Sequence, residues 1–359
     1  MSIIVDPTPF YKKLCFNLLS IGLLTLLLYV GQDILVPFFF AILLASMLLP
    51  VITFLERKGI HHVVAISVAL SVSMILIGFI FYFLITQIVN FLDDLPAIQE
   101  RLENLSSVIQ KWVRETFSVT IRKQNQYINE SALKMKGSGV DILQQTFVTV
   151  TQVLSYMVLL PLYTFLILYY RNMIKKFLAD VFKGSSAEEV REILQESQAV
   201  SHSFIAGLMI EMTIVFALNA AGFLILGIKY ALFLALVAAL LNLLPYVGML
   251  IANILCMVIT LISSEVLQMG DVVWVGIILG IVQFIDNNFL MPLVVGSKVR
   301  INSLATVLGV LVGGALCGVP GMFLSIPGLA LLKVIFDRAE ALKPFGMLLG
   351  DDSPVRTRK

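Results

Sequence analysis

Long uncharged stretches separated by short charged segments make up most of the chain. Leu14–Gln32 and Ile34–Leu55 contain no charged residue, and each is close to the roughly 20 apolar helical residues that cross a bilayer core of about 30 Å. The next uncharged run, residues 59–92, is longer than one crossing needs. We therefore expect a third helix that begins near Val63, leaves the membrane and continues beyond it. Residues 1–92 then form an N-terminal membrane region of three spans.

Three further runs predict single crossings. Ile142–Tyr170 is uncharged and predicts a fourth span (142–171). This span is broken or kinked at Pro161, because proline removes an amide donor and blocks the preceding helical turn. Phe204–Ile228 predicts another span, and Asp271–Val295 predicts an ordinary span further along the chain.

Two uncharged stretches are too long for one crossing and too short for two. They are Tyr230–Ser264 and Ile301–Leu332, interrupted near their middles by Leu244–Met249 and Gly318–Met322 respectively. Proline and glycine in both interruptions permit the chain to reverse. We expect each stretch to form a re-entrant helical hairpin, whose tip must be buried in protein or face a wet cavity. The alternative is a long, tilted helix that crosses once.

The distribution of basic residues favours the hairpins. With hairpins, 17 of the 25 Lys and Arg residues are cytoplasmic, including those of the connector Ser297–Arg300. The loop Ser264–Asp271, which has no Lys or Arg, is then external, as the positive-inside rule requires. Both arrangements place both termini in the cytoplasm. With hairpins, residues 204–264 and 265–340 each form a span followed by a hairpin, in an inverted repeat of the kind that marks transporter binding sites.

Composition agrees with lipid as the solvent. Hydrophobic residues make up 59% of the 359 residues and charged residues 13%, against about 45–50% and about 25% in soluble domains. The net charge of +2 is too balanced for a nucleic-acid-binding protein. Cys15, Cys256 and Cys317 lie in apolar stretches and form no disulfide or metal-binding pattern. Nucleotide-binding and hydrolase motifs are absent from the sequence, so we expect no enzymatic activity, cofactor or metal, and no ATP-driven transport within this chain.

Charged residues concentrate in two blocks. Asp93–Asp141 holds 14 of them, with apolar residues at helical spacing. This block predicts a helical extracytoplasmic insertion (93–141) that packs on neighbouring helices or on another copy of the chain. Residues 172–203 predict a cytoplasmic amphipathic connector. Its Ser185–Ser203 helix is expected to lie along the inner membrane surface as an elbow between two membrane halves. Residues 341–359 are expected to form a cytoplasmic tail.

The most unusual polar cluster inside a span is Asp286-Asn287-Asn288, which precedes Pro292. An ionisable residue in a membrane span is costly and usually faces a cavity or a partner. Asp286 is the candidate carboxylate for coupling to H⁺ or Na⁺, and both Asn amides are candidate ligands of substrate hydroxyls. Alternatively, Asp286 caps a broken helix or pairs with a basic residue of the 297–300 connector.

Other polar residues in the spans are secondary candidates. Asn219 and Asn242 form interhelical hydrogen bonds or bind substrate, and Tyr246 is a pocket wall or an interfacial ring. Glu211, one turn into its span, is expected to form an ion pair facing the membrane interface, and proton coupling is the alternative. Pro245 and Pro320 mark the two tips between which substrate would bind. The remaining candidates are residues for hairpin packing, which permit close helix approach or break a helix: Gly248, Pro292, Gly313, Gly314, Gly318 and Gly321.

Several of these segments resemble the AI-2E family, the autoinducer-2 exporter family of bacteria. Gly227–Leu232 with Leu244–Gly248 resembles its first hairpin, and Leu160–Tyr163 with Tyr170-Arg171 resembles its span after the insertion. Its C-terminal signature is similar to three further segments, Asp286–Pro292 with Gly296–Val299, Gly313–Met322, and Ile326-Pro327. The chain departs from the family at Leu208, where Gln is frequent, and at Ser303, where Pro is frequent. A polar contact available to other members at the first position is absent here.

The resemblance implies a homopentameric inner-membrane transporter in which two helical hairpins form the substrate region and move like an elevator. Some members resemble Na⁺(Li⁺)/H⁺ antiporters. We therefore expect an all-α polytopic membrane protein that exports a small polar solute similar to autoinducer-2, with a role in quorum sensing. Its partners would be membrane lipid, the solute, H⁺ or Na⁺ and further copies of the chain, without nucleic acid. The alternatives are a cation/proton antiporter in which Asp286 titrates, and an oligomeric scaffold or pore without coupled transport.

Overall fold

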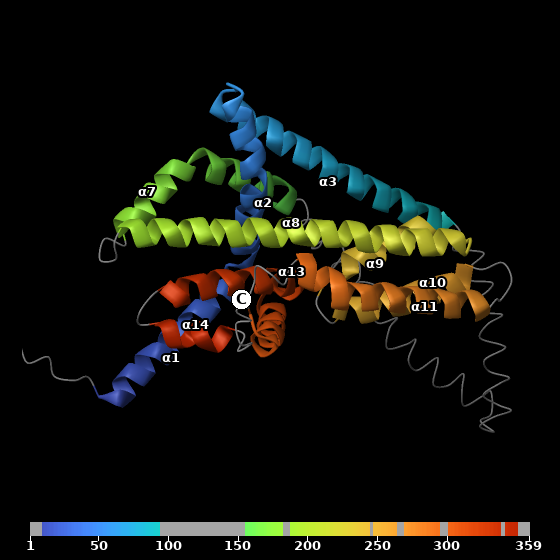
Figure 1. Ribbon diagram of the computed structural model, residues 1–359. Coiled ribbons are helices and arrows are strands. Elements are labelled where there is room, and N and C mark those ends of the chain that lie inside the picture. Colours follow the sequence, from blue (N-terminus) through green and yellow to red (C-terminus); the bar gives the residue numbers. More distant parts are fainter. Residues whose placement is uncertain are drawn as a thin grey trace, which may run out of the picture. The chain divides into compact units, whose positions relative to one another are not determined.

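The computed structural model describes residues 9–93, 155–181, 187–244, 247–263, 269–294, 301–338 and 342–350, and these residues form helices joined by short turns (Figure 1). The chain divides into two compact units. Unit 1 comprises Met1–Pro50, Leu162–Ile205 and Lys298–Lys359, and unit 2 comprises Val51–Pro161 and Ala206–Ser297. The prediction of an all-α fold is confirmed for the described residues.

The first two helices of unit 1 coincide with the first two uncharged runs. α1 (Phe10–Val30) and α2 (Gln32–Arg57) are separated by Gly31 alone. The Gly31 backbone N–H donates to the carbonyl oxygen of Leu27 at 2.8 Å, which closes the last turn of α1. Asp33 lies in the first turn of α2, where its charge complements the helix dipole. α2 extends beyond Pro50 into unit 2.

The next described helix, Ser155–Tyr169, continues through Pro161 and then bends by 67° into α7 (Arg171–Val181). The predicted break at Pro161 is therefore wrong, since the sharp bend lies at Tyr170. The apolar run ends at this point and a charged segment begins with Arg171. The change of direction thus follows the change from apolar to basic residues rather than the position of the proline.

α8 (Ala187–Ile225) is one continuous helix. It contains the last part of the predicted connector and the following span, and no break separates the two. The placement of the Ser185–Ser203 helix along the inner membrane surface stays a prediction. No proline or glycine interrupts residues 187–206, and a continuous helix is the favoured result. α8 ends at Ile225, and Gly227, two residues further on, has a φ of +68°. The Ile228 N–H donates to Phe223 O and the Gly227 N–H to Leu224 O, a Schellman motif that satisfies the terminal carbonyl groups.

α13 (Ser303–Arg338) consists of two helical halves, and the chain reverses its direction between them at Cys317 and Gly318, whose φ and ψ are not helical. Gly318 has φ +61° and ψ −146°, a conformation essentially restricted to glycine. The two halves pack against each other, because the Ser325 hydroxyl donates to the carbonyl oxygen of Gly309 at 2.8 Å. A helix–turn–helix is therefore present in this stretch, and its re-entrant placement in a membrane stays a prediction.

The ends of α13 are fixed within unit 1 by polar contacts. At its start, Asn302 Oδ1 accepts the N–H of Ala305 at 2.7 Å as an N-cap. Asn302 Nδ2 donates to the carbonyl oxygens of Leu348 and Gly350, which joins α14 (Lys343–Leu349) to this end. At the other end, the Arg338 guanidinium forms ion pairs with Glu192 at 2.7 Å and Glu196 at 2.9 Å, both on the unit 1 part of α8.

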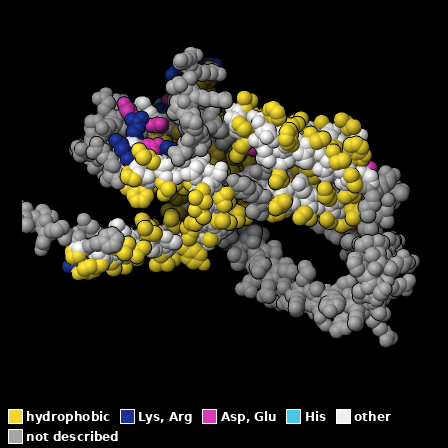
Figure 2. All heavy atoms as spheres, turned by 60° about the horizontal axis from the view of Figure 1, so that its bottom comes forward, with side chains coloured by type: hydrophobic (Ala, Val, Ile, Leu, Met, Phe, Trp, Pro, Cys, Tyr) yellow, Lys and Arg dark blue, Asp and Glu magenta, His cyan; other side chains and the backbone are white. Residues whose placement is uncertain are grey.

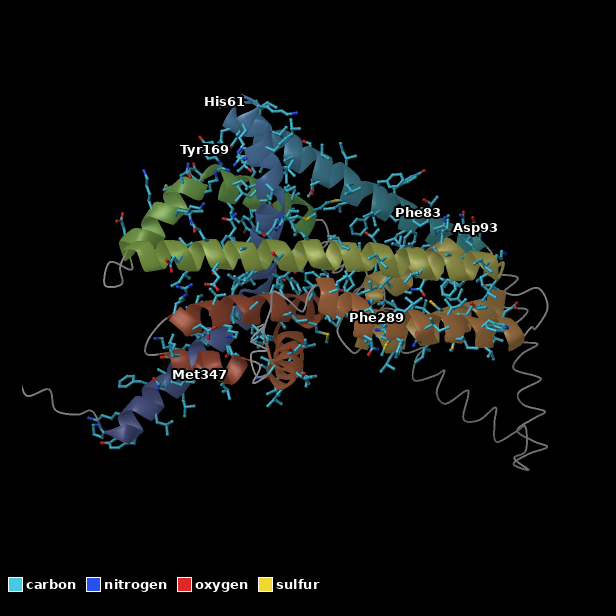
Figure 3. The ribbon with its side chains drawn as sticks, viewed as in Figure 1. His61, Phe83, Asp93, Tyr169, Phe289 and Met347 are labelled. Carbon is cyan, nitrogen blue, oxygen red and sulfur yellow. The ribbon has the colours of Figure 1, made fainter. Side chains whose placement is uncertain are left out.

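Unit 2 is built around α3 (His62–Asp93), the second part of α8, α9 (Ala231–Leu241), α10 (Val247–Ser263) and α11 (Met269–Ile285). One buried cluster of unit 2 includes Phe223 of α8, Leu234 of α9, Cys256 of α10 and Val275 of α11. α3 joins this cluster through Phe91, whose ring packs edge-on against Tyr230 at 5.6 Å. α3 continues to Asp93, as Figure 3 shows, in agreement with the predicted long helix.

α9 and α10 form a second helix–turn–helix, within unit 2. The turn contains Asn242, the C-cap of α9, and the Cys256 thiol of α10 contacts the carbonyl oxygen of Leu234 at 3.7 Å. A Cβ atom at Gly248 would lie 1.7 Å from the Leu241 carbonyl oxygen, so only glycine permits this approach of the two helices. The re-entrant placement of this pair and the inverted repeat stay predictions, as they do for α13.

The described surface is predominantly apolar, and charged side chains occupy small areas of the face in Figure 2. Residues such as Phe79, Tyr82, Leu293 and Leu311 are more than 60% exposed. Within the described residues, five helices are long and apolar enough to cross a membrane, or six if the bent pair at Tyr170 counts as one span. α13 is one of the five, although its reversal means that its full length is not a single crossing. These features support a multi-pass membrane protein. The predicted insertion (93–141) lies outside the described residues, apart from Asp93.

Candidate functional site

Asp286 begins a π-helical turn, η1 (Asp286–Leu290), between α11 and α12 (Met291–Val294). The Met291 backbone N–H donates to Asp286 O, so this hydrogen bond spans five residues instead of four. Pro292 follows directly and has no N–H to continue the α-helical pattern. π-helical turns are rare and frequently mark functional sites. The label on Phe289, which belongs to this turn, marks its place in Figure 3.

The Asp286 side chain meets two polar side chains from other helices of unit 2. Asn242 Nδ2 donates to Asp286 Oδ2 at 3.0 Å and lies 3.5 Å from Glu211 Oε1. Glu211 and Asp286 are each only 4% exposed. α8, the end of α9 and η1 thus converge at one point, and we refer to Glu211, Asn242 and Asp286 together as the polar triad.

Buried apolar side chains lie about one helical turn from each member of the polar triad. Val215, Ala239 and Val282 form a buried cluster, against which Met212 and Leu290 pack. Glu211 Oε2 and Asp286 Oδ1 are buried and have no hydrogen-bond partner. A buried carboxyl oxygen without a partner is costly. The triad therefore has two free acceptors in a place where water is largely excluded, which suits a bound proton or a polar ligand.

The position of Glu211 corrects the sequence-based expectation. An ion pair facing the membrane interface was expected, but the side chain is buried, and no ion pair of Glu211 occurs among the described residues. Its helical position alone could not show this, because the partner side chain, Asn242, lies 31 residues away in the sequence.

Gln283 is a further member of the site that the sequence analysis did not identify. Its Nε2 lies 3.4 Å from Asp286 Oδ2 and donates to Asn287 Oδ1 at 3.1 Å. The available signal was its spacing, since residues three apart lie on one face of a helix. Gln283 thus supplies a second amide donor beside the Asp286 carboxyl group.

The Asp286-Asn287-Asn288 cluster does not converge on one point. Asn287 and Asn288 are exposed, and Asn288 Nδ2 donates to the carbonyl oxygen of Phe284 at 2.8 Å. Only Asp286 points into the core of unit 2. Its predicted alternative partners, Lys298 and Arg300, lie outside the described residues.

Asn219 lies two helical turns after Glu211 on α8 and is 2% exposed. Its Nδ2 donates to the Val215 carbonyl oxygen at 3.0 Å, and its Oδ1 has no hydrogen-bond partner. Positions eight apart share a helix face, so Asn219 adds a polar group on the side of α8 that carries Glu211. Among the described residues, Asn219 forms no hydrogen bond with the triad itself.

The two predicted tips have different outcomes. Pro245 and Tyr246 lie outside the described residues. Pro320 lies in unit 1, in the second half of α13, directly after the reversal at Gly318. There, Cβ atoms at Gly313 and Gly321 would lie 2.5 Å or less from the opposing half, and one at Gly314 would lie 2.7 Å from the flexible end of Met322. The first two glycines allow the backbones of the two halves to touch.

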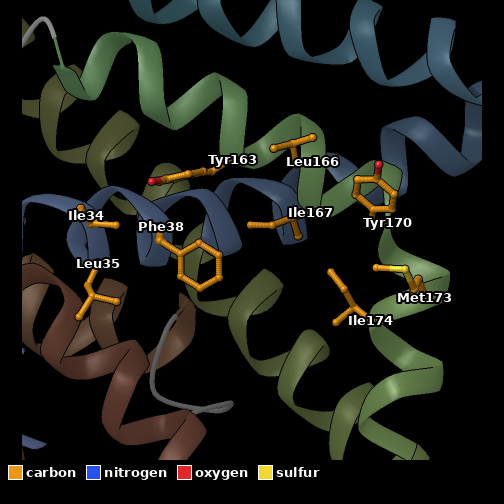
Figure 4. Close-up of a pocket in the computed structure, with 9 residues that line it drawn as sticks. All are labelled: Ile34, Leu35, Phe38, Tyr163, Leu166, Ile167, Tyr170, Met173 and Ile174. Atoms are coloured by element: carbon orange, nitrogen blue, oxygen red, sulfur yellow. The ribbon is translucent and has the colours of Figure 1, made fainter. Parts of the chain in front are cut away.

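Two pockets of unit 1 are apolar. The pocket in Figure 4 has a volume of about 460 Å³ and lies between α2, the helix Ser155–Tyr169 and α7, with Phe38, Ile167 and Met173 in its wall. A second pocket of about 580 Å³ lies between α1, α2 and α13, next to Gly313 and Ser325. Their linings suit lipid chains better than a polar solute. In the described ranges, no group of three or more His, Cys, Asp or Glu side chains could hold a metal ion.

Comparisons with known proteins agree with the resemblance seen in the sequence. The family model described as AI-2E family transporter matches residues 18–341. The AI-2 transport protein TqsA of Escherichia coli is 23% identical over 89% of this chain and 90% of its own length. A sodium-lithium/proton antiporter of Halobacillus andaensis is 20% identical over 92% of this chain and 96% of its own. A Mycobacterium tuberculosis protein named for transport is 25% identical over 83% of this chain and 81% of its own length.

Proposed function

Because the chain belongs to the AI-2E family of transporters, we propose that it is a secondary transporter that exports a small polar solute similar to autoinducer-2. The observation that carries this proposal is the polar triad. Three polar side chains from three helical elements meet inside an apolar, membrane-type unit. Such groups are expensive in a membrane and usually belong to a transport pathway.

In the proposed mechanism, the two helix–turn–helix segments carry the solute across the membrane in an elevator-type movement. Asn242 connects this movement to the ion site, because it lies at the α9–α10 turn and contacts both acids. Asn219, Tyr246, Asn287 and Asn288, with the tips at Pro245 and Pro320, are the proposed substrate contacts. The protein would act in a bacterial inner membrane, with both termini cytoplasmic and five copies in the assembly.

A Na⁺(Li⁺)/H⁺ antiporter is the second candidate function. It is favoured by the presence of two buried carboxyl groups, Glu211 and Asp286, since an antiporter without an organic substrate needs an acid that titrates. A relative over nearly the whole chain is also named as such an antiporter. A scaffold or pore without coupled transport is the third candidate.

Transport by purified protein in vesicles separates these functions. Export predicts uptake of a radiolabelled autoinducer-2-like solute into proteoliposomes under an imposed ΔpH. The antiporter predicts Na⁺- or Li⁺-dependent collapse of ΔpH instead, and the scaffold predicts neither. For either transport function, we expect Asp286→Asn to reduce the coupled flux to the level of empty vesicles.

Asp271→Asn is the matched control, since Asp271 lies in the first turn of the same helix, α11, and is not part of the triad. We expect its flux to equal that of the unmodified protein. If Asp286→Asn leaves every measured flux unchanged, the coupling role of Asp286 is wrong. If the unmodified protein moves neither solute nor cation, the transport proposal is wrong.

A further inference from the structure

We infer that Glu211 and Asp286 form one proton-binding site, in which the two carboxyl groups hold a single proton between them and Asn242 reports its presence to the α9–α10 turn. The inference rests on the proposed transport function and deepens it, since it names the proton as the coupling ion. It also assigns Glu211 a role equal to that of Asp286.

The two carboxyl groups share one amide donor. One amide nitrogen, Asn242 Nδ2, lies 3.0 Å from Asp286 Oδ2 and 3.5 Å from Glu211 Oε1, so the two carboxyl groups are held around a common donor. They also lie within hydrogen-bonding reach of each other. A carboxylate can only accept a hydrogen bond. A direct hydrogen bond between the two groups therefore requires a proton on one of them.

The two carboxyl groups lie close together in buried, apolar surroundings. Both residues are only 4% exposed, and buried apolar residues of α8, α9 and α11 lie about one helical turn away. Two carboxylate charges side by side in such surroundings repel each other and lose their hydration. A single proton removes one charge, converts repulsion into a hydrogen bond and leaves the other charge for the Asn242 and Gln283 amides.

Lys, Arg and His are absent from the six helical segments of unit 2 that the chain forms from residue 206 onward, within the described ranges. The unit 2 part of α8 contains Glu211 as its only titratable residue, and α9 contains none. α10 contributes Cys256, whose thiol contacts the Leu234 carbonyl oxygen. α11 contributes Asp271, about four turns from Asp286. η1 and α12 contain no titratable residue apart from Asp286. A proton is thus the counter-charge that the arrangement can accept.

The consequence for transport lies in the position of Asn242. Its amide has two N–H groups, which suits one contact with each carboxyl oxygen while the proton joins the pair. When the proton leaves to water, the two carboxylates separate, and one amide nitrogen can no longer contact both. The α9–α10 turn is then released from one of the two helices. Proton loss and hairpin movement are coupled through these two contacts.

Infrared spectroscopy of the full-length protein in lipid tests the site without any transport measurement. Exposed carboxyl groups, with reference pKa values of about 4, are ionised at neutral pH. We expect a carboxylic-acid C=O band at neutral pH that is lost at alkaline pH and is absent from Glu211→Gln and from Asp286→Asn alike. Either substitution removes the repulsion, so the remaining acid ionises among its amide donors. Asp271→Asn is expected to keep the band.

Two spectroscopic outcomes overturn the inference. One is an unmodified protein without the band. The other is a band that persists in either single variant, since the proton then belongs to one acid only. Glu211→Asp provides a second test if an amide variant fails to fold, because it keeps a carboxyl group and is expected to keep the band.

Flux measurements separate this inference from the proposed function. We expect Glu211→Gln to abolish proton-coupled flux as fully as Asp286→Asn, and the double variant to lose no more than either. If the unmodified vesicles show no flux while the spectra agree, the transport function fails and the proton site stands. If the unmodified protein transports and Glu211→Gln transports equally well, the shared site fails and the function stands.

Discussion

Asn242 is the residue of unit 2 that connects the two buried acids Glu211 and Asp286. It contacts acids that are 31 and 44 positions away in the sequence, and it does so from the last turn of a helix that is otherwise apolar. An amide inside an apolar segment is usually explained by an interhelical hydrogen bond. Here the partners are carboxyl groups, and hydrogen bonds to ionised groups are stronger than those between neutral groups.

We predict that Asn242→Ala destabilises the protein by about 1–3 kcal/mol, because buried carboxyl oxygens lose their donor. The measurement is thermal unfolding of the purified protein in detergent. Asn253→Ala on α10 is the control, since Asn253 is half-buried and outside the triad, and we expect a clearly smaller shift of Tm. Equal shifts for the two variants would show that the triad adds no stability through Asn242.

At the scale of elements, the conformation of one glycine separates the two halves of α13. Gly318 has a positive φ, yet a Cβ atom there would meet nothing within 4 Å. The requirement for glycine is therefore one of backbone conformation and not of space. At Gly313 and Gly321 the requirement is the reverse, because their added Cβ atoms would collide with the opposing backbone.

Gly318→Ala is therefore expected to lower stability by about 1–3 kcal/mol, the cost of forcing a Cβ-bearing residue into this region of φ and ψ. Gly328→Ala, in the second half of the same helix, also places its Cβ in open space. It should leave Tm unchanged or raise it, because alanine is the better helix former by about 1 kcal/mol. Thermal unfolding of both variants in the same detergent measures the difference. A Gly318→Ala protein as stable as Gly328→Ala would contradict the assigned role of the backbone.

At the scale of the whole molecule, the topology in the membrane decides which sides the two helix–turn–helix segments face. The chain reverses at both of the predicted places, in the α9–α10 turn and at Gly318. A reversal is necessary for a re-entrant hairpin but does not give its side. The basic connector Ser297–Arg300 and the acidic loop Ser264–Asp271 exchange sides between the two predicted arrangements, so they distinguish them.

We predict that a cysteine at Ser297 is labelled only from the cytoplasmic side, and a cysteine at Ser264 only from the outside. Each cysteine is introduced into a variant that lacks Cys15, Cys256 and Cys317. It is then labelled with a membrane-impermeant maleimide in intact cells and in inverted vesicles. Ser353→Cys is the control, because both arrangements predict that the C-terminal tail is cytoplasmic. External labelling at position 297 would contradict the hairpin arrangement.

The sequence by itself determined the class of the protein, its family and most of its helices. A segment that lies in lipid carries few charged residues, so the uncharged runs reveal the helices from local sequence alone. Glycine and proline likewise act on their own backbone, so the two chain reversals could be predicted from Leu244–Met249 and Gly318–Met322. The family resemblance was confirmed by the match over residues 18–341.

Only the tertiary structure decided which polar residues meet. The sequence grouped Asp286 with its neighbours Asn287 and Asn288, but successive residues of a helix point in different directions, and the two amides are exposed. Glu211 and Asn242 reach Asp286 because three helical elements of unit 2 pack around one apolar cluster. Such contacts depend on helix packing over long sequence separations, which no local pattern encodes.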